Sequence, residues 1–225
     1  MSLLLLAHFF TFSTLLLLSD CKSTPKLSNS KSSAIKPSAS NSSVSKSKNP
    51  ARYAIKASAV GGIAGTIIEK YMDKQAAQLR QDLEGISQVE RVGQGIEVTL
   101  NSAVLFKPNS YELVTDWQPK LKKLAETLLV YKDTEMLIAS HTSNVGSAEE
   151  NQVLSQKQAE SLADFLQAHE VSVLRLVTQG FGQDTPKILG DTEDARRQNQ
   201  RVELVIVANT ALKKQAKREA RGKSQ

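Results

Sequence analysis

The feature that most constrains the fold of this chain is a regular alternation of strand-like and helix-like segments between residues 94 and 208. Short apolar or alternating runs with the length of strands occur at 96–100, 104–106, 136–139, 174–178 and 201–207. Helical patterns separate them, one opening at Ser110, one over 149–169 and a short polar one over 191–198. This order predicts an α+β domain, a two-layer sandwich in which helices cover one face of a mixed sheet.

The two longer helical patterns each present one apolar face. After Ser110 the apolar residues follow at steps of three or four: Leu113, Trp117, Leu121, Leu124 and Leu128. The second pattern places Leu154, Leu162, Phe165 and Leu166 on one stripe. Two such stripes and the strands between them are enough to build one hydrophobic core, so we expect residues 94–208 to form one domain.

The N-terminus reads as an export signal. Residues 3–18 are almost wholly apolar, which is the length of a signal-peptide core and short for a transmembrane helix. The run ends just before Cys21, the one cysteine of the chain. We therefore predict a lipoprotein-type signal peptide over 1–20 and lipid attachment at Cys21, because attached acyl chains give stable membrane anchoring. Asp20 in place of a small residue departs from that pattern, and an ordinary cleaved signal with a leftover cysteine is the alternative.

Two segments connect this signal to the domain. Residues 21–50 hold eleven serines and six lysines with no acid and no aromatic residue, a composition that predicts a disordered linker spanning about 30 Å. Residues 51–85 predict a helical segment ending at Gly85, with small residues at four-residue spacing at Ala57, Gly61 and Gly65. Such a helix could insert into a membrane, bind a second copy or an envelope partner through 57–65, or simply pack on its own domain.

Charge and composition narrow the class of function. The chain has a formal net charge of +6, but the linker carries +6 and the tail at 209–225 carries +5, which leaves −5 for the remainder. A nucleic-acid-binding domain carries its basic charge on the folded face that contacts phosphates, so we expect no nucleic acid partner. The basic tail fits a solvated end or one near anionic lipid headgroups. A single cysteine and three scattered histidines predict no disulfide, no metal site and no cofactor.

Five short motifs then occur in a fixed order. They are Val104-Leu105-Phe106-Lys107-Pro108-Asn109-Ser110, Ser140-His141-Thr142-Ser143-Asn144-Val145-Gly146, Asn151-Gln152-Val153-Leu154-Ser155-Gln156-Lys157-Gln158-Ala159, Gly180-Phe181-Gly182 with Pro186, and Asn199-Gln200-Arg201-Val202-Glu203. In this order they resemble the OmpA C-terminal, peptidoglycan-associated domain over residues 95–207. The small-residue helix and Tyr71-Met72-Asp73-Lys74-Gln75 resemble the glycine-zipper outer-membrane lipoproteins of this family, of the YiaD type.

The resemblance implies a βαβαβ-type fold, a lipid-anchored position at the outer membrane with the domain in the periplasm, and a non-enzymatic role. It further implies association of the outer membrane with peptidoglycan through a site for diaminopimelate. The residues at the matching positions are Asn109, Thr142, Ser143, Asn151, Leu154, Ser155, Gln158, Asn199 and Arg201. Most of these residue types also have ordinary structural roles, in local hydrogen bonds, core packing or ion pairs.

Two positions depart from the family pattern. In the family a loop aspartate faces the ligand ammonium and a helix arginine faces its carboxylate, whereas this chain has Ser143 and Gln158 there. Each charge-assisted hydrogen bond contributes about 1.5–3 kcal/mol, so losing both weakens binding by about two to four decades. Lys157 or Arg175 could supply the missing cation.

Two functions other than wall binding are considered. The alternative to wall binding is a protein-interaction module of the envelope that has lost the amino-acid site. An enzyme is not expected. His141 stands next to Thr142 and Ser143, but adjacent residues on a strand end point in different directions and no third orienting acid is evident.

Overall fold

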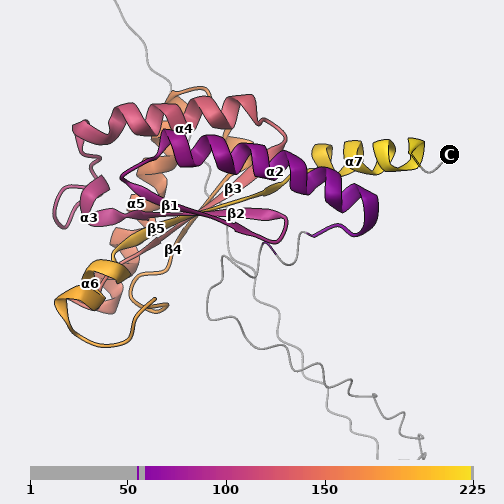
Figure 1. Ribbon diagram of the computed structural model, residues 1–225. Coiled ribbons are helices and arrows are strands. Elements are labelled where there is room, and N and C mark those ends of the chain that lie inside the picture. Colours follow the sequence, from indigo (N-terminus) through magenta and orange to yellow (C-terminus); the bar gives the residue numbers. More distant parts are fainter. Residues whose placement is uncertain (1–54, 56–58, 224–225) are drawn as a thin grey trace, which may run out of the picture. The chain divides into compact units, whose positions relative to one another are not determined.

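The computed structural model describes residue 55 and residues 59–223, and the predicted signal peptide, Cys21 and the predicted linker lie outside them. Five strands form one mixed sheet in the order β1-β2-β5-β3-β4, of which only the β3–β4 pair is parallel (Figure 1). The strands are β1 (Ser87–Val92), β2 (Gly95–Asn101), β3 (Thr134–His141), β4 (Leu176–Gly180) and β5 (Arg201–Ala208). The mixed sheet of the α+β prediction is confirmed.

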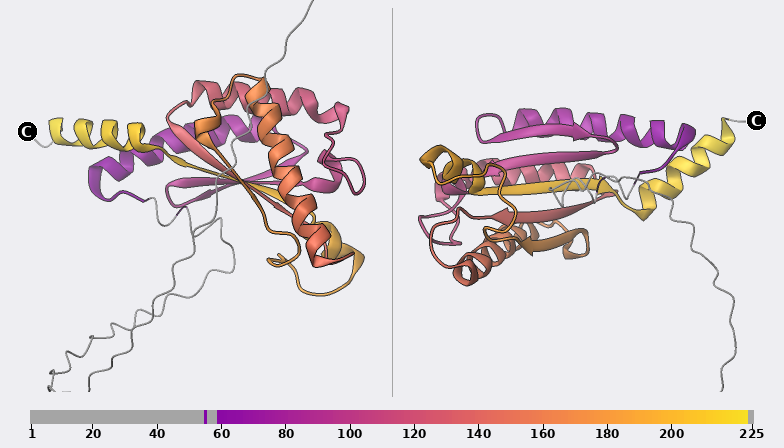
Figure 2. Two further views of the ribbon diagram at one scale, coloured as in Figure 1. Left: turned by 180° about the vertical axis from the view of Figure 1, so that it is seen from behind. Right: turned by 90° about the horizontal axis from the view of Figure 1, so that it is seen from below.

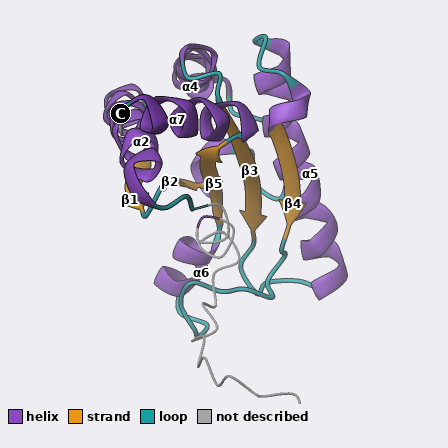
Figure 3. Ribbon diagram, turned by 90° about the vertical axis from the view of Figure 1, so that its right-hand side faces the viewer, coloured by secondary structure: helices purple, strands orange, loops and turns teal. Residues whose placement is uncertain are grey.

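Helices cover one face of this sheet and form the core with it. The longer helices are α2 (Gly62–Asp82), α4 (Gln118–Val130), α5 (Ala148–Ala168) and α7 (Thr210–Gly222), and the short ones are α3 (Ser102–Leu105) and α6 (Glu193–Asn199). The helical stripes meet alternate strand residues such as Val98 and Leu204 in a single hydrophobic cluster. Figure 3 shows α5 alongside β3 and β4, which are the strands that it contacts.

Two predicted elements differ in detail around the turn from β2 to α4. Residues 104–106 do not continue the strand, because the Asn101 side chain accepts from Ala103 N at 2.9 Å and caps α3. The helix expected to open at Ser110 begins at Gln118, after a 3-10 turn at Thr115–Trp117. Before it, Leu113 pairs with Phe106 in an isolated β-bridge, and Pro119 then marks the first helical turn.

The strand predicted at 174–178 also begins later, at Leu176. Residues Val173–Arg175 form a 3-10 turn, because the Arg175 side chain reaches across to backbone carbonyls around the start of β3. Two elements were not predicted as such: β1 pairs with β2 at the sheet edge, and the basic tail forms α7 against α2. Thus α2 contributes to the core, and β1 to the sheet, of the domain predicted at residues 94–208.

The small-residue segment packs on its own domain, one of the alternatives that the sequence left open. Gly65 lies against Val60 O and the Gln94 amide, and Ile68 and Met72 are buried in the core. The Gln94 side chain forms hydrogen bonds with both backbone groups of Val60. Gln94 Oε1 accepts from Val60 N at 2.7 Å, and Gln94 Nε2 donates to Val60 O at 2.6 Å. Within the described residues, no helix is long and apolar enough to cross a membrane.

Candidate functional site

A pocket of about 310 Å³ lies at the end of β3, where four of the five sequence motifs meet. Its wall includes Phe106 and Lys107 from the first motif, the loop that follows His141, and the first turns of α5. Six of the residues predicted from the motifs line it: Asn109, Thr142, Ser143, Asn151, Leu154 and Gln158. The topology therefore brings segments about fifty residues apart in sequence around one cavity.

Backbone and side-chain hydrogen bonds hold the loop between β3 and α5 in place. Thr142 N donates to Gly182 O at 2.8 Å, and the Asn151 amide donates to Val145 O at 3.0 Å. Ser147 and Glu150 cap the start of α5 reciprocally, and these hydrogen bonds lower the pKa of the Glu150 carboxyl. The loop is thereby fixed over the helix start, and the pocket wall is built before any ligand arrives.

Ser143 and Gln158, the two positions at which the sequence analysis expects a charged pair to be lost, both form hydrogen bonds within the protein. Ser143 is 3% exposed, and its hydroxyl accepts from Gln200 Nε2 at 3.3 Å. Gln158 Oε1 accepts from the Ser140 hydroxyl at 2.9 Å, and its Nε2 donates to Ser110 O at 3.0 Å. Gln158 is buried. Both polar groups of the Gln158 side chain are thus hydrogen-bonded within the protein, and neither serine nor glutamine carries a charge.

The charges at the pocket come from residues that were not among the predicted site residues. Lys107, Glu193 and Arg196 all line the cavity. Lys107 Nζ lies 2.5 Å from Glu112 Oε1, so its charge is balanced locally. Arg196 Nε is buried and has no hydrogen-bond partner in the described part of the chain, and the same holds for Thr142 Oγ1. These two donors are suited to an anionic or carbonyl oxygen in the pocket.

Neither of the cations proposed from the sequence lines this pocket. Arg175 donates to the carbonyl oxygens of Leu128, Tyr131 and Thr134, which lie by the start of β3, whereas the pocket lies at its end. The prediction for Arg175 is therefore wrong. Lys157 Nζ stands 5.3 Å from the centre of the Tyr111 ring and lines an adjoining pocket instead.

Three of the predicted site residues lie outside the pocket lining and hold neighbouring segments together. The Ser155 hydroxyl accepts from Gly182 N at 2.9 Å and donates to Gln152 O at 3.0 Å. Asn199 Oδ1 accepts from the backbone of Lys187 and Ile188, at 2.8 and 3.0 Å. The third, Arg201, lies in a buried polar network on the face of the sheet that the helices leave open.

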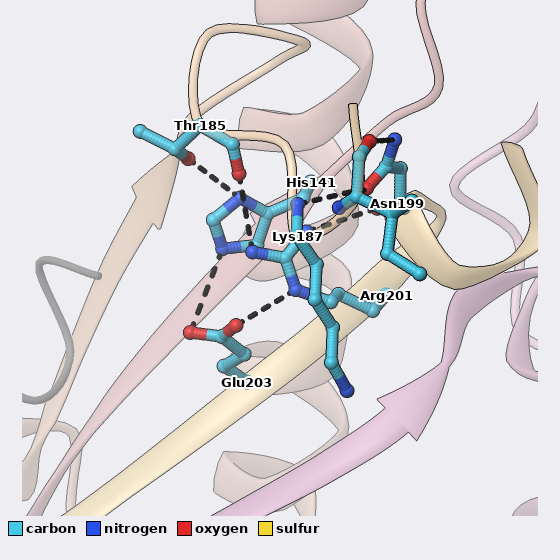
Figure 4. A network of polar contacts seen from close by, with 7 residues as sticks. His141, Thr185, Lys187, Asn199, Arg201 and Glu203 are labelled. Carbon is cyan, nitrogen blue, oxygen red and sulfur yellow. Dashed lines mark hydrogen bonds and ion pairs between the residues drawn. The ribbon is translucent and has the colours of Figure 1, made fainter. Parts of the chain in front are cut away.

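That network joins Arg201, Glu203, His141 and Thr185 (Figure 4). Arg201 Nε donates to Glu203 Oε1 at 2.7 Å, and His141 Nδ1 lies 2.9 Å from the Thr185 hydroxyl. Burial, with Arg201 nearby, lowers the pKa of His141 to about 3, so the ring is neutral at physiological pH. His141 is thus bonded to Thr185, whereas Ser143 is bonded to Gln200, and the two do not form a base and nucleophile pair.

No metal centre is evident in residue 55 or residues 59–223. Nowhere in this part of the chain do three or more His, Cys, Asp or Glu side chains gather closely enough to hold a metal ion. The arrangement is that of a binding pocket with hydrogen-bond donors and one arginine.

Comparison with known proteins agrees with this geometry. The sequence pattern of the OmpA family matches residues 105–200, which include most of the pocket wall. The outer-membrane lipoprotein YfiB of Pseudomonas aeruginosa is 30% identical over 51% of this chain and 68% of its own length. This chain belongs to the OmpA family. A protein of Escherichia coli called "Probable lipoprotein YiaD" is 32% identical over 60% of this chain.

The match to that Escherichia coli relative covers 63% of the relative's length, so part of it has no counterpart in the match. Among solved structures, the cell wall anchor of the type VI secretion system from Pseudomonas aeruginosa superposes with a TM-score of 0.54 and 26% identity. That superposition covers 60% of this chain and 97% of the anchor. The fold is thus shared over the superposed part of this chain.

Proposed function

We propose that this OmpA-family domain binds the peptide part of peptidoglycan in the pocket at the end of β3. The observation that carries the proposal is the convergence there of Asn109, Thr142, Asn151 and Leu154, which stand at family motif positions. The relation to a protein described as a cell wall anchor supports the same role. The role is binding rather than catalysis, since His141 is buried, neutral and held by Thr185.

The site is a weakened version of a diaminopimelate site. An amino-acid end carries an ammonium and a carboxylate, and opposite charges at fixed positions would hold both. Ser143 and Gln158 offer neither charge and are bonded to Gln200, Ser140 and Ser110. Binding weaker than that of a fully charged site by about two to four decades follows from the loss of two charge-assisted hydrogen bonds.

The same proposal includes the tether. Cys21, directly after the apolar run at 3–18, would carry lipid, and residues 22–50 would connect it to the domain. The name of the related YfiB lipoprotein of Pseudomonas aeruginosa places that protein at the outer membrane. The chain would then link that membrane to the cell wall without a covalent bond to the wall. Metabolic labelling with a radioactive fatty acid should label the wild type and leave a Cys21→Ala variant unlabelled.

Co-sedimentation with purified sacculi tests the pocket. The variant Ser143→Asp with Gln158→Arg restores both charges and should sediment with sacculi at protein concentrations at least about tenfold lower than wild type. The matched control adds the same charges at exposed positions as Ser172→Asp with Gln167→Arg, and should sediment as wild type does. Equal sedimentation of wild type and the restored variant would remove this explanation of positions 143 and 158.

A second candidate function is an envelope protein-interaction module, and one observation favours it. An adjoining pocket of about 670 Å³ is rimmed by exposed apolar side chains, Tyr111, Val145 and Val153, at 49%, 57% and 55% exposure. Exposed apolar side chains grouped at a cavity are typical of protein or peptide contacts. If neither wild type nor the restored variant sediments with sacculi, this second function is favoured.

A further inference from the structure

The two ends of the sheet differ in what they present. The pocket lies where β5 begins, because Arg201 pairs with His141 and Asn101. At the other end β5 stops at Ala208, about 25 Å away along an eight-residue strand, and α7 follows directly. Figure 1 shows α6, beside the pocket, and α7 at opposite ends of the sheet.

The chain also reaches the domain at the α7 end. Val60, just before α2, is hydrogen-bonded to Gln94 in the turn between β1 and β2. Ile55 packs on Val205 and Val207 in the second half of β5, and on Gly95 at the start of β2. Everything that precedes residue 55, including the apolar run at 3–18 and Cys21, is therefore attached to the end that carries α7.

Helix α7 has one apolar side and one basic side. Leu212 and Ala216 are buried, and the helix packs against α2, as the views in Figure 2 show. The remaining surface carries Lys214, Lys217, Arg218, Arg221 and Lys223, all exposed, with Lys213 half-exposed and Glu219 as the one acid. None of these six bases forms an ion pair within the described residues.

Unpaired bases at this density on one helix are unusual in a domain whose other residues are net acidic. Charges paired within the protein, such as Arg201 with Glu203, are already satisfied, whereas the α7 bases are hydrated and free to attract an anionic surface. Ile63, at the start of α2, adds an apolar side chain that is 49% exposed at the same end. Clusters of exposed Lys and Arg side chains on a helix attract anionic lipid headgroups.

We propose that the basic side of α7 docks on the headgroups of an anionic lipid bilayer, at the end of the domain from which the N-terminal chain leaves. The bilayer is the occupant because the apolar run and Cys21 belong to the chain attached at this end. Docking there turns the opposite end, with the pocket, away from the membrane. The inference concerns the orientation of the domain and does not depend on which ligand the pocket takes.

Vesicle binding of the full chain tests the proposal. Cys21→Ala removes the attachment point for lipid, and binding to pure phosphatidylcholine vesicles gives the background from the apolar run at 3–18. Vesicles that also contain phosphatidylglycerol should bind this protein more tightly, and the added affinity should fall as salt rises. Changing Lys214, Lys217, Arg218 and Arg221 to Gln should lower the affinity for these vesicles by a factor on the order of a thousand.

The linker provides the matched control, since it holds lysines that are not on α7. Changing Lys31, Lys36, Lys46 and Lys48 to Gln removes the same charge and should cost less than the α7 substitutions. If the α7 variant keeps its affinity for phosphatidylglycerol vesicles, or the linker variant loses as much as the α7 variant, the proposal is overturned.

A probe at each end of the domain tests the orientation. In the Cys21→Ala background, a fluorophore is attached at Gly222→Cys on α7 or at Leu189→Cys in the loop before α6. A quencher carried on lipid headgroups should quench the probe at 222 and leave the probe at 189 bright. Equal quenching at both positions, or quenching at 189 alone, would contradict docking through α7.

Discussion

The pocket end and the α7 end of this domain use charged side chains in opposite ways. Near the pocket, Arg201 and Glu203 are 5% and 3% exposed and are paired with each other. On α7, Lys214, Lys217 and Arg221 are exposed and unpaired. The difference teaches that a charged residue inside a family motif can serve the fold, while charges outside the motifs remain available to partners. Unfolding free energies can test this division directly.

The largest expected effect is at Arg201. Arg201→Ala should lower the free energy of unfolding by about 3–5 kcal/mol, because it leaves the Glu203 carboxylate buried without its cation. Urea unfolding followed by circular dichroism measures it. The control is Arg197→Ala on α6, where the pair with Asp194 is exposed at 3.5 Å and is worth at most about 1 kcal/mol. If Arg201→Ala lowers the unfolding free energy by less than about 1 kcal/mol, the buried pair of Arg201 and Glu203 does not stabilise the pocket end of the domain.

The next effect concerns the close approach of β4 to α5. A Cβ on Gly180 would lie 2.7 Å from both Gln156 Cα and Ser155 Oγ. Gly180→Ala should therefore cost about 1–3 kcal/mol of unfolding free energy through forced displacement of α5. A Cβ on Gly61 would meet nothing within 4 Å, so Gly61→Ala should be close to wild type in stability. Thermal melts of wild type and the two variants measure both effects. Equal melting temperatures for all three proteins would contradict the packing described for Ser155.

Acid should weaken the pocket end through His141. Its pKa of about 3 in the folded protein lies below the usual value of 6.5, so the unfolded chain takes up a proton that the folded one refuses. Stability is therefore complete above pH 6.5 and falls as pH drops toward 3, by about 2 kcal/mol between pH 7 and pH 5. In His141→Gln, the midpoint of urea unfolding should depend less on pH across this range than it does in the wild type. An unchanged slope in that variant would assign the pH dependence to other groups.

The smallest effect is expected on α7. Each single change of Lys214, Lys217 or Arg221 to Gln should alter the unfolding free energy by less than about 0.5 kcal/mol, because no ion pair is lost. Leu212→Ala, which removes a buried side chain from the contact with α2, should cost about 2–5 kcal/mol and so serves as the contrasting substitution on the same helix. Destabilisation by the charge changes alone would mean that these bases support the fold.

The sequence predicted those elements whose apolar pattern is complete. β2 and β5 alternate with Val98 and Leu204 facing the core, and the stripe of α4 repeats at helical spacing. β1 lacks such a pattern, because an edge strand with one partner needs few apolar residues and here carries Gln88 and Glu90. The sequence predicts only a basic tail where α7 forms, since the buried stripe of this helix consists of only Leu212 and Ala216.

The sequence predicts the motifs that contribute to the candidate site, but it does not predict which of their side chains line the pocket. Motif order identified Thr142 and Asn151, which line the pocket, together with Arg201, which does not. Side-chain direction decides between these outcomes, and it depends on strand register and on where α6 sits. Arg196 could not be selected from sequence for the same reason, because a short polar helix has no apolar stripe that fixes its rotation.

We propose that peptidoglycan bound in the pocket at the end of β3 meets Arg196, whose Nε is buried without a hydrogen-bond partner in the described part of the chain. The most direct test is co-sedimentation of the full chain with purified sacculi, comparing Arg196→Gln with Arg197→Gln. Both remove one arginine from α6, but only Arg196 lines the pocket. The account predicts that Arg196→Gln lowers the bound fraction at least about tenfold and that Arg197→Gln leaves it unchanged. Equal binding by the two variants, or no binding by wild type, would contradict it.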